Sequence, residues 1–317
     1  MRQWRTATVR SATCIWPEAS MRRRNRLFEP PSTSTTRIAK DHPEMDSFQS
    51  GLAITQVHLG FLYATTGRRA EAERSYRAAL EIRQQLVKKR PGSSEHVIDL
   101  AEVQSHLGRL ALASDRPQDA LTWFEQARRQ LQPMHEKGPD KHRSEELLTE
   151  SWVGSAMALA AMSRPAESAK AWDQAFKLDK GKNRLVIRLR RAEALAHAGD
   201  FTRALAEAED LAQVKGLPRG EYYNLACFWS LAVTAARRDT KLSADMRDKE
   251  AERRATRALD LLRKAEAAGY FKDPAIVDHL DKDKDLERSA RARITSPGEN
   301  AWSRKESPKW PCVILLH

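Results

Sequence analysis

The chain has 317 residues, and Ala, Leu, Arg and Glu dominate nearly every window, while aromatic residues make up only 7%. This composition favours helix over strand, and three widely spaced cysteines (Cys14, Cys227 and Cys312) argue against a disulfide framework or a structural zinc site and suit a reducing compartment. The net charge of +12 is concentrated at one end, since residues 1–40 contain nine basic and two acidic residues, so the body of the chain is close to neutral.

The N-terminal segment, residues 1–40, mixes Arg, Pro, Ser and Thr and predicts a disordered basic tail. It has no continuous apolar stretch followed by a cleavage site, so we expect no secretory signal and a cytoplasmic protein. Its "MRRRNR" stretch could contact phosphates, which leaves nucleic-acid binding as an alternative function. The absence of interleaved aromatic residues argues against that alternative.

From about residue 41 the chain repeats itself. The stretch "HLGFLYATTGRRAEAERSYRAAL" begins at residue 58, and "HLGRLALASDRPQDALTWFEQAR" begins 48 residues later, at 106. Five positions keep their chemical type over three copies: Pro43, Pro91 and Pro139; Gly60, Gly108 and Ala156; Ala72, Ala120 and Ser168; Tyr76, Phe124 and Trp172; Ala79, Ala127 and Ala175. A fixed period of this size predicts a repeat protein.

Each copy predicts two helices, because apolar residues recur at helical spacing on both sides of a short turn. We expect Pro117 and Pro165 to begin second helices, since proline suits the first helical position. Gly67 and Gly199 should close first helices in the left-handed conformation. The small Gly or Ala of the first helix should allow a close approach, with the aromatic residue of the second helix filling the adjacent space.

These residues resemble the tetratricopeptide repeat, whose pattern is W-x2-L-G-x2-Y followed by A-x3-F-x2-A. The first copy supplies Leu59, Gly60, Tyr63, Ala72, Tyr76 and Ala79, and the third keeps the tryptophan as Trp152. A shorter fourth unit follows, and a fifth begins "YYNLACFW" and continues after a charged insertion at 237–250. The 48-residue period looks like the long-helix variety of this repeat.

The resemblance implies an all-α solenoid of about five helical hairpins, wound as a right-handed superhelix over residues 41–270. The expected units are about 46–90, 94–135, 143–180, 183–214 and 219–268. Residues 271–317 are expected to form a capping segment and a disordered tail. The apolar run at 222–236 is too short to span a membrane and predicts a buried helix.

A second, looser resemblance is to the C-terminal repeat region of bacterial serine/threonine protein kinases. It rests on the order of long repeats, a short repeat, "YNLACFWSLA" and "RRATRALDLLRKAEAAGYFKDP". The kinase motifs G-x-G-x-x-G, H-R-D and D-F-G do not occur in the sequence. The alternative function is therefore a regulatory or docking region of such a kinase, or a truncated relative of one.

No catalytic or metal signature has the spacing that its chemistry needs. The sequence contains no G-x-S-x-G, no H-E-x-x-H and no phosphate-binding G-x-x-x-x-G-K-[ST]. His135 and His142 fall in a predicted linker without a third ligand at useful spacing. We therefore expect no enzymatic activity, no cofactor and no metal site.

The resemblance implies a binding wall made by the first helix of each unit. The candidate peptide-binding residues on this wall are His58, Phe61, His106, Arg109, Met157, Arg190, Glu193 and Asn224. None of the wall positions bears lysine, which argues against an EEVD-type chaperone tail as ligand. Asn224 matches the asparagine with which long-helix relatives bind a peptide backbone, and His58 or His106 stands there in the first two copies.

Two alternatives remain for these side chains. Phe61 and Met157 are as well explained by packing between neighbouring repeats as by ligand contact. The many Glu and Arg residues elsewhere on the helices are predicted to form solvated faces. The sequence as a whole predicts a non-catalytic scaffold that binds a protein or peptide.

Overall fold

The computed structural model describes residues 37, 39, 41–138, 140–181, 183–214 and 217–272. The predicted disordered tails, with Cys14 and Cys312, lie almost entirely outside these residues. The described part of the chain contains ten α-helices and no β-strand, so the predicted all-α fold of helical hairpins is confirmed. The chain divides into two compact units, and the boundary lies inside one helix, between Ile187 and Arg188.

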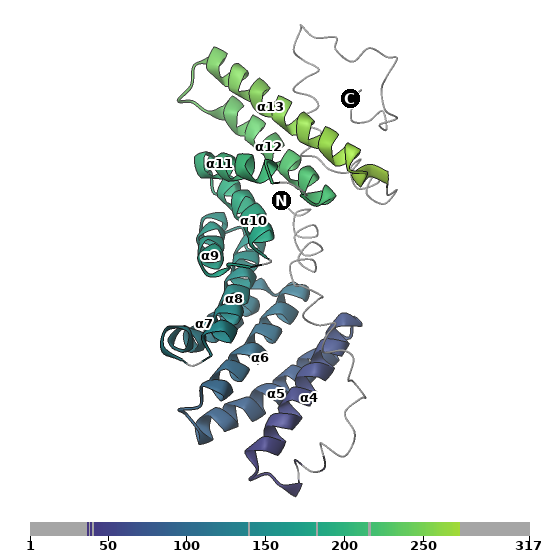
Figure 1. Cartoon of the computed structure of the whole chain (residues 1–317), viewed down its shortest axis with the longest axis vertical. Helices are drawn as coiled ribbons and strands as arrows, with labels where there is room; N and C mark the ends of the chain where they lie inside the picture. The colour runs from purple at the N-terminus through teal and green to yellow at the C-terminus, as the bar shows by residue number, and fades with distance from the viewer. Residues whose placement is uncertain are drawn as a thin grey trace. The chain divides into compact units, whose positions relative to one another are not determined.

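Unit 1 consists of three successive helical hairpins (Figure 1). The helices are α4 (Asp46–Thr65) with α5 (Arg69–Lys89), α6 (Ser94–Ala113) with α7 (Pro117–Lys137), and α8 (Lys141–Ala161) with α9 (Pro165–Leu178). Within each hairpin the two helices pack along one another, and α5 also packs on α6 and α7 on α8. The first helices α6 and α8 are in direct contact as well. Every hairpin in this unit is therefore held by its neighbour.

The turns inside the hairpins share one backbone geometry. Helices α7 and α9 begin at Pro117 and Pro165, as the sequence predicts. Gly67 has φ of 78°, also as predicted, and Asp115 (55°) and Ser163 (59°) adopt the same left-handed conformation 48 and 96 residues later. After each, a backbone N–H reaches the carbonyl five residues back: Arg68 to Tyr63, Arg116 to Ala111, and Arg164 to Leu159. The turn is thus a helix-closing motif that repeats even where the glycine does not.

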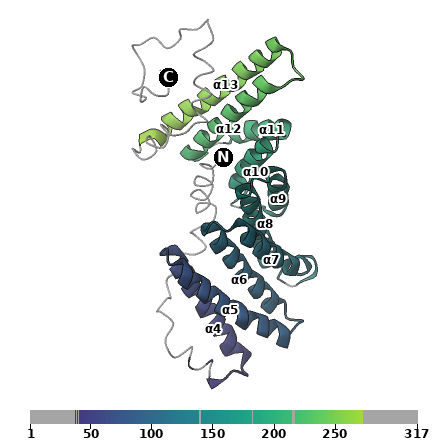
Figure 2. The same ribbon diagram turned by 180° about the vertical axis from the view of Figure 1, so that it is seen from behind.

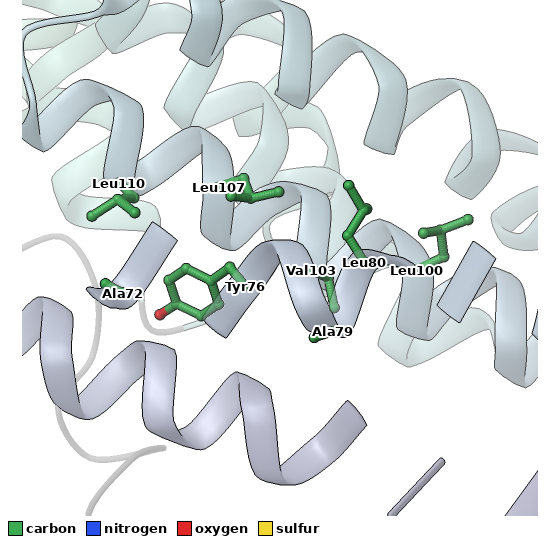
Figure 3. Packing of buried hydrophobic residues seen from close by; sticks show 8 residues of the cluster. All are labelled: Ala72, Tyr76, Ala79, Leu80, Leu100, Val103, Leu107 and Leu110. Atoms are coloured by element: carbon green, nitrogen blue, oxygen red, sulfur yellow. The ribbon is translucent and has the colours of Figure 1, made fainter. Parts of the chain in front are cut away.

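The contact between α5 and α6 forms a compact apolar cluster (Figure 3). Its buried members are Ala72, Tyr76, Ala79, Leu80, Leu100, Val103, Leu107 and Leu110. Tyr76 also lies against α4, where a Cβ added at Gly60 would come within 2.6 Å of its ring. The predicted pairing of a small residue with a bulky one is therefore confirmed in the first repeat.

Phe124 on α7 extends this pairing to two helices at once. Its side chain is completely buried. A Cβ added at Gly108 on α6 would come within 2.8 Å of the ring, and one added at Gly154 on α8 would overlap it. The ring is therefore held between the first helix of its own hairpin and the first helix of the next hairpin. The repeat pattern gave Ala156 as the small residue of that next helix, but the residue that faces the ring is Gly154.

Unit 2 begins within α10 (Arg184–His197) and continues with α11 (Phe201–Ala212), α12 (Arg219–Arg238), α13 (Ala244–Ala267) and a short 3-10 helix, Tyr270–Lys272. Gly199 closes α10 with φ of 84°, as predicted. Helices α12 and α13 pack side by side over most of their lengths, as both views show (Figures 1 and 2). Within the described ranges, no helix is long and apolar enough to cross a membrane.

The predicted charged insertion at 237–250 is wrong in extent. Only residues 239–243 separate α12 from α13. Ser243 caps α13 by accepting a hydrogen bond from the backbone N–H of Met246, and Lys249 pairs with Asp245 one turn earlier, at 2.7 Å. The charged residues therefore form the solvated first turns of a helix, because a capping serine and i,i+4 pairs stabilise helix there.

Candidate peptide-binding surface

In unit 1 the first helices α6 and α8 lie closer together than the second helices α7 and α9. Helix α6 contacts α8 directly, whereas an open groove separates the second helices α7 and α9. Four of the five candidate residues that the sequence places on α4, α6 and α8 are half-buried, and Met157 is buried, with 7% of its surface exposed. That burial favours packing, rather than ligand contact, as the role of Met157.

His106 and Arg109 lie together at the junction of three helices. The His106 ring stacks on Tyr76 of α5, with ring centroids 5.2 Å apart and an interplanar angle of 7°. The Arg109 guanidinium donates to Nδ1 of His106, and its Nη1 lies 3.5 Å from Oε2 of Glu150 on α8. Two of the predicted residues are thus in contact, and Arg109 also pairs with Glu150, which sequence reasoning missed.

A set of charged side chains continues from this point along the junction of α5, α6 and α8. Arg143 of α8 contacts Asp99 at 2.5 Å and Glu102 at 2.6 Å, both on α6. Asp99 also pairs with Arg83 of α5 at 2.7 Å. We call the seven side chains together the ionic cluster: Arg83, Asp99, Glu102, His106, Arg109, Arg143 and Glu150.

The ionic cluster corrects the expectation that charged helix residues form solvated faces. Arg83 is 5% exposed and Asp99 is 12% exposed, so this pair is inside the unit. Charges at such depth are tolerated because they are paired, and Arg83 keeps one nitrogen, Nε, without a hydrogen-bond partner among the described residues. The cluster ties α8 to the preceding hairpin in addition to the apolar contacts.

The two glutamates of the cluster titrate in opposite directions. Burial would raise the pKa of Glu102, but its interactions with His106 and Arg143 hold that pKa far below the usual range. Burial raises the pKa of Glu150 from 4.5 to about 7, and the charge of Arg109 only partly opposes this. At neutral pH the face between α6 and α8 therefore contains one firmly ionised carboxylate and one that readily takes up a proton.

This difference predicts the pH dependence of stability. Because the folded pKa of Glu150 is raised, the stability that its protonated form contributes is present below pH 4.5 and is lost as the pH rises through about 7. Glu150→Gln should remove this loss. Between pH 5 and pH 8 the free energy of unfolding should therefore fall by on the order of 1–3 kcal/mol less in the variant than in the wild type. Urea unfolding at both pH values measures it, and parallel pH profiles would contradict the assignment. Glu102 does not interfere, since its contribution is lost only in acid.

The candidate residue His58 lies between two exposed apolar side chains on α4. Ile54 and Leu62 are 46% and 54% exposed, and they stand four residues before and after His58, which places all three on one stripe of the helix. Phe61 is half-buried nearby on the same helix. This stripe offers exposed apolar contact area beside His58.

The candidates in unit 2 have local partners. Arg190 pairs with Glu193 one turn later on α10, with 2.9 Å between the charged atoms. Asn224 on α12 donates from Nδ2 to Glu221 on the same helix, at 2.9 Å. Each is half-buried, so both sites keep polar atoms at the surface of their helices.

His135 and His142, predicted to lie in a linker, belong to α7 and α8 instead. His135 pairs with Glu145, with 3.9 Å between the nearest atoms. Among the residues that the structure describes, no group of three His, Cys, Asp or Glu side chains is placed to hold a metal ion.

Comparison with known proteins identifies the repeat. The tetratricopeptide repeat family model matches residues 51–132, which cover most of α4, all of α5 and α6, and most of α7. Over these residues the chain is similar to the tetratricopeptide repeat. The hairpin of α8 and α9, which follows the matched residues, keeps their helix order, turn geometry and neighbour packing.

Solved structures with a similar arrangement have low sequence identity. A putative kinesin light chain from Podosopora anserina with nearly identical TPR-like repeats is 19% identical, with a TM-score of 0.49, and the match covers 70% of this chain and 96% of that one. Pseudomonas aeruginosa pilF is 17% identical (TM-score 0.29; 71% and 98% covered). A TPR repeat protein from Bacteroides fragilis is 12% identical (0.31; 77% and 99%). A comparison with curated proteins found no match.

Proposed function

We propose that the chain is a non-catalytic scaffold that binds a segment of another protein along the first helices of unit 1, α4, α6 and α8. Tetratricopeptide repeats generally mediate protein–protein interaction, which supports the class of function. The observation that carries the proposed location is the contact between α6 and α8, because it brings Arg109 and Glu150 side by side. Both are partly exposed, so a ligand can reach them.

The chemistry of these helices indicates the kind of ligand. Ile54 and Leu62 offer apolar contact, while Arg109 and Glu150 offer hydrogen bonds that orient a backbone or a polar side chain. Arg190, Glu193 and Asn224 would offer polar contacts of the same kind on unit 2, taken by itself. Without lysine at the predicted wall positions, an EEVD-type chaperone tail remains a poor candidate. We place the scaffold in the cytoplasm, in keeping with its cysteine pattern.

The kinase-linked alternative gains no support from the matched family model or from the three structures above. The proposal does not depend on it, because the same helices would bind a partner whether or not a kinase domain belongs to the protein.

The test has two steps and uses the full chain. Tagged protein captures partners from a lysate of its own cells, and calorimetry then measures the affinity of each captured partner for the wild type, Arg109→Gln and Leu62→Ser. Arg129→Gln is the matched control, because Arg129 is exposed on the second helix α7. We expect affinity to fall about tenfold or more for the first two variants and to stay unchanged for the control. Equal affinities for all four equally helical proteins would exclude the first-helix surface.

A further inference from the structure

The groove between α7 and α9 has a different composition from the first-helix surface. It is open, has a volume of about 310 Å³, and has buried Leu121, Leu159 and Ala171 among its lining residues. Trp152 of α8 is half-buried in the same lining. A groove of this size and apolar content can accept one or two side chains of a peptide.

Arg128 of α7 is the cation best placed in this groove. Its guanidinium lies 4.0 Å from the centre of the Trp152 ring, and its Nη1 donates to the carbonyl oxygen of Ser151 and to Oγ of Ser155. No carboxylate of the described residues lies within ion-pairing distance of it, and none of those residues accepts from its Nε or Nη2. Neither of these two nitrogens is buried.

The free edge of Arg128 is the edge that binds carboxylates. Nε and Nη2 are parallel donors at the spacing of the two carboxylate oxygens, so one acid group can accept from both. Trp152 and the serines hold the guanidinium in place, which reduces the rotamer freedom lost on binding. Burial lowers the pKa of Arg128 to about 10, and the charge of Glu125 one turn earlier only partly opposes this.

The opposite wall of the groove, on α9, provides a second cation, whereas the other basic residue of the lining is already paired with a carboxylate. Lys170 of α9 lines the groove, is exposed, and has no ion pair with any described residue. Arg164 is fully engaged by Glu167, with two contacts of 2.6 Å. Glu125 of α7 also lines the groove, one turn before Arg128, and its charge acts on both Arg128 and Arg164. Among the described residues, the groove therefore has one cation without an ion pair on each wall, Arg128 and Lys170, and two carboxylates, of which Glu167 is paired with Arg164.

We propose that this groove is a second docking site, which takes an acidic peptide segment: one Asp or Glu side chain received by Arg128 and Lys170, beside an apolar side chain on Leu121, Leu159 and Trp152. Charge complementarity selects the carboxylate, and Glu125 limits the ligand to a single acid rather than a long acidic run. The site lies between second helices, so it is separate from the first-helix surface and leaves that surface free.

A phage-displayed library of random nonapeptides, selected on the full-length protein, tests the chemistry. Parallel selections use Arg128→Gln, Lys170→Gln and the control Arg129→Gln, which makes the same charge change one residue away on the exposed side of α7. We expect peptides with one Asp or Glu next to an apolar residue to be enriched on the wild type and the control, and to be depleted on the two groove variants. Enrichment of the same peptides on all four proteins, or of peptides without an acid, overturns the proposal.

The most enriched peptide is then synthesised with a fluorescent label, and its affinity is measured by anisotropy. We expect about tenfold weaker binding to Arg128→Gln, several-fold weaker binding to Lys170→Gln, and no change for Arg129→Gln. Glu125→Gln should bind several-fold tighter, because it removes a like charge from the groove. Lys170 and Glu125 form no hydrogen bond or ion pair with any described residue, so these variants test binding even if Arg128→Gln is less stable. Unchanged affinity in the Lys170 and Glu125 variants overturns the proposal.

Discussion

Replacing Phe124 by alanine should lower the free energy of unfolding by about 3–5 kcal/mol. The ring is completely buried and contacts both α6 and α8, so its removal leaves a cavity that neither helix can fill alone. Urea unfolding followed by circular dichroism at 222 nm measures the change. Leu62→Ala is the control, because that side chain is 54% exposed and should lose less than about 0.5 kcal/mol. Similar losses for the two variants would contradict the packing described for Phe124.

Two helix glycines, only one of which faces the ring, give a complementary control. Alanine is favoured over glycine in a helix by about 1 kcal/mol, so Gly51→Ala on α4, where nothing lies within 4 Å of the added Cβ, should stabilise the chain by that order. Gly154→Ala makes the same chemical change but places its Cβ inside the ring of Phe124, and should be destabilising. The changes in the free energy of unfolding should therefore have opposite signs in the two variants, which separates the effect of helix propensity from that of packing.

Removing Asp99 from the ionic cluster should cost about 3–5 kcal/mol, since breaking one partner of a buried pair leaves an uncompensated charge. In Asp99→Ala the Arg83 guanidinium, 5% exposed, loses this ion pair and keeps only the longer-range attraction of other carboxylates such as Glu102. Asp245→Ala is the matched control, because its pair with Lys249 is exposed and should leave the unfolding midpoint unchanged.

Salt provides a second test of the same prediction. Exposed pairs are screened within about 3 Å at 1 M salt, whereas buried pairs are screened much less. The loss caused by Asp99→Ala should therefore persist when unfolding is repeated in 1 M NaCl. If the loss disappears in salt, the cluster behaves as a surface network and the interpretation of its burial is wrong.

The repeat pattern predicted the fold because its signals are local and recur. Pro117 and Pro165 mark helix starts by their fixed φ, and the pairing of Gly60 with Tyr76 recurs as Gly108 with Phe124 at a constant spacing. Gly154 was not predicted as a packing residue, because it stands two positions before the column that holds Gly60 and Gly108. It faces a ring of the preceding hairpin, and a column comparison within single hairpins cannot show that contact.

The ionic cluster could not be predicted for a related reason. Asp99 and Arg143 are 44 residues apart, and neither position carries an equivalent charge in the other copies. A charged residue on a helix is usually solvated, so only the packing of α6 against α8 reveals that these side chains face one another. The left-handed conformation of Asp115 and Ser163 was not predicted, because glycine is the residue that routinely adopts it and other residues do so only occasionally.

The position of Phe124 between two hairpins also affects how the repeats unfold locally. In an array whose units contact only their neighbours, each hairpin could unfold from an end without disturbing the rest. A ring shared by Gly108 and Gly154 does not allow this at the junction of the second and third hairpins, because releasing either first helix exposes the same side chain. Backbone amides of α6, α7 and α8 should therefore exchange with solvent deuterium in a single cooperative opening, while α4, at the end of unit 1, exchanges earlier.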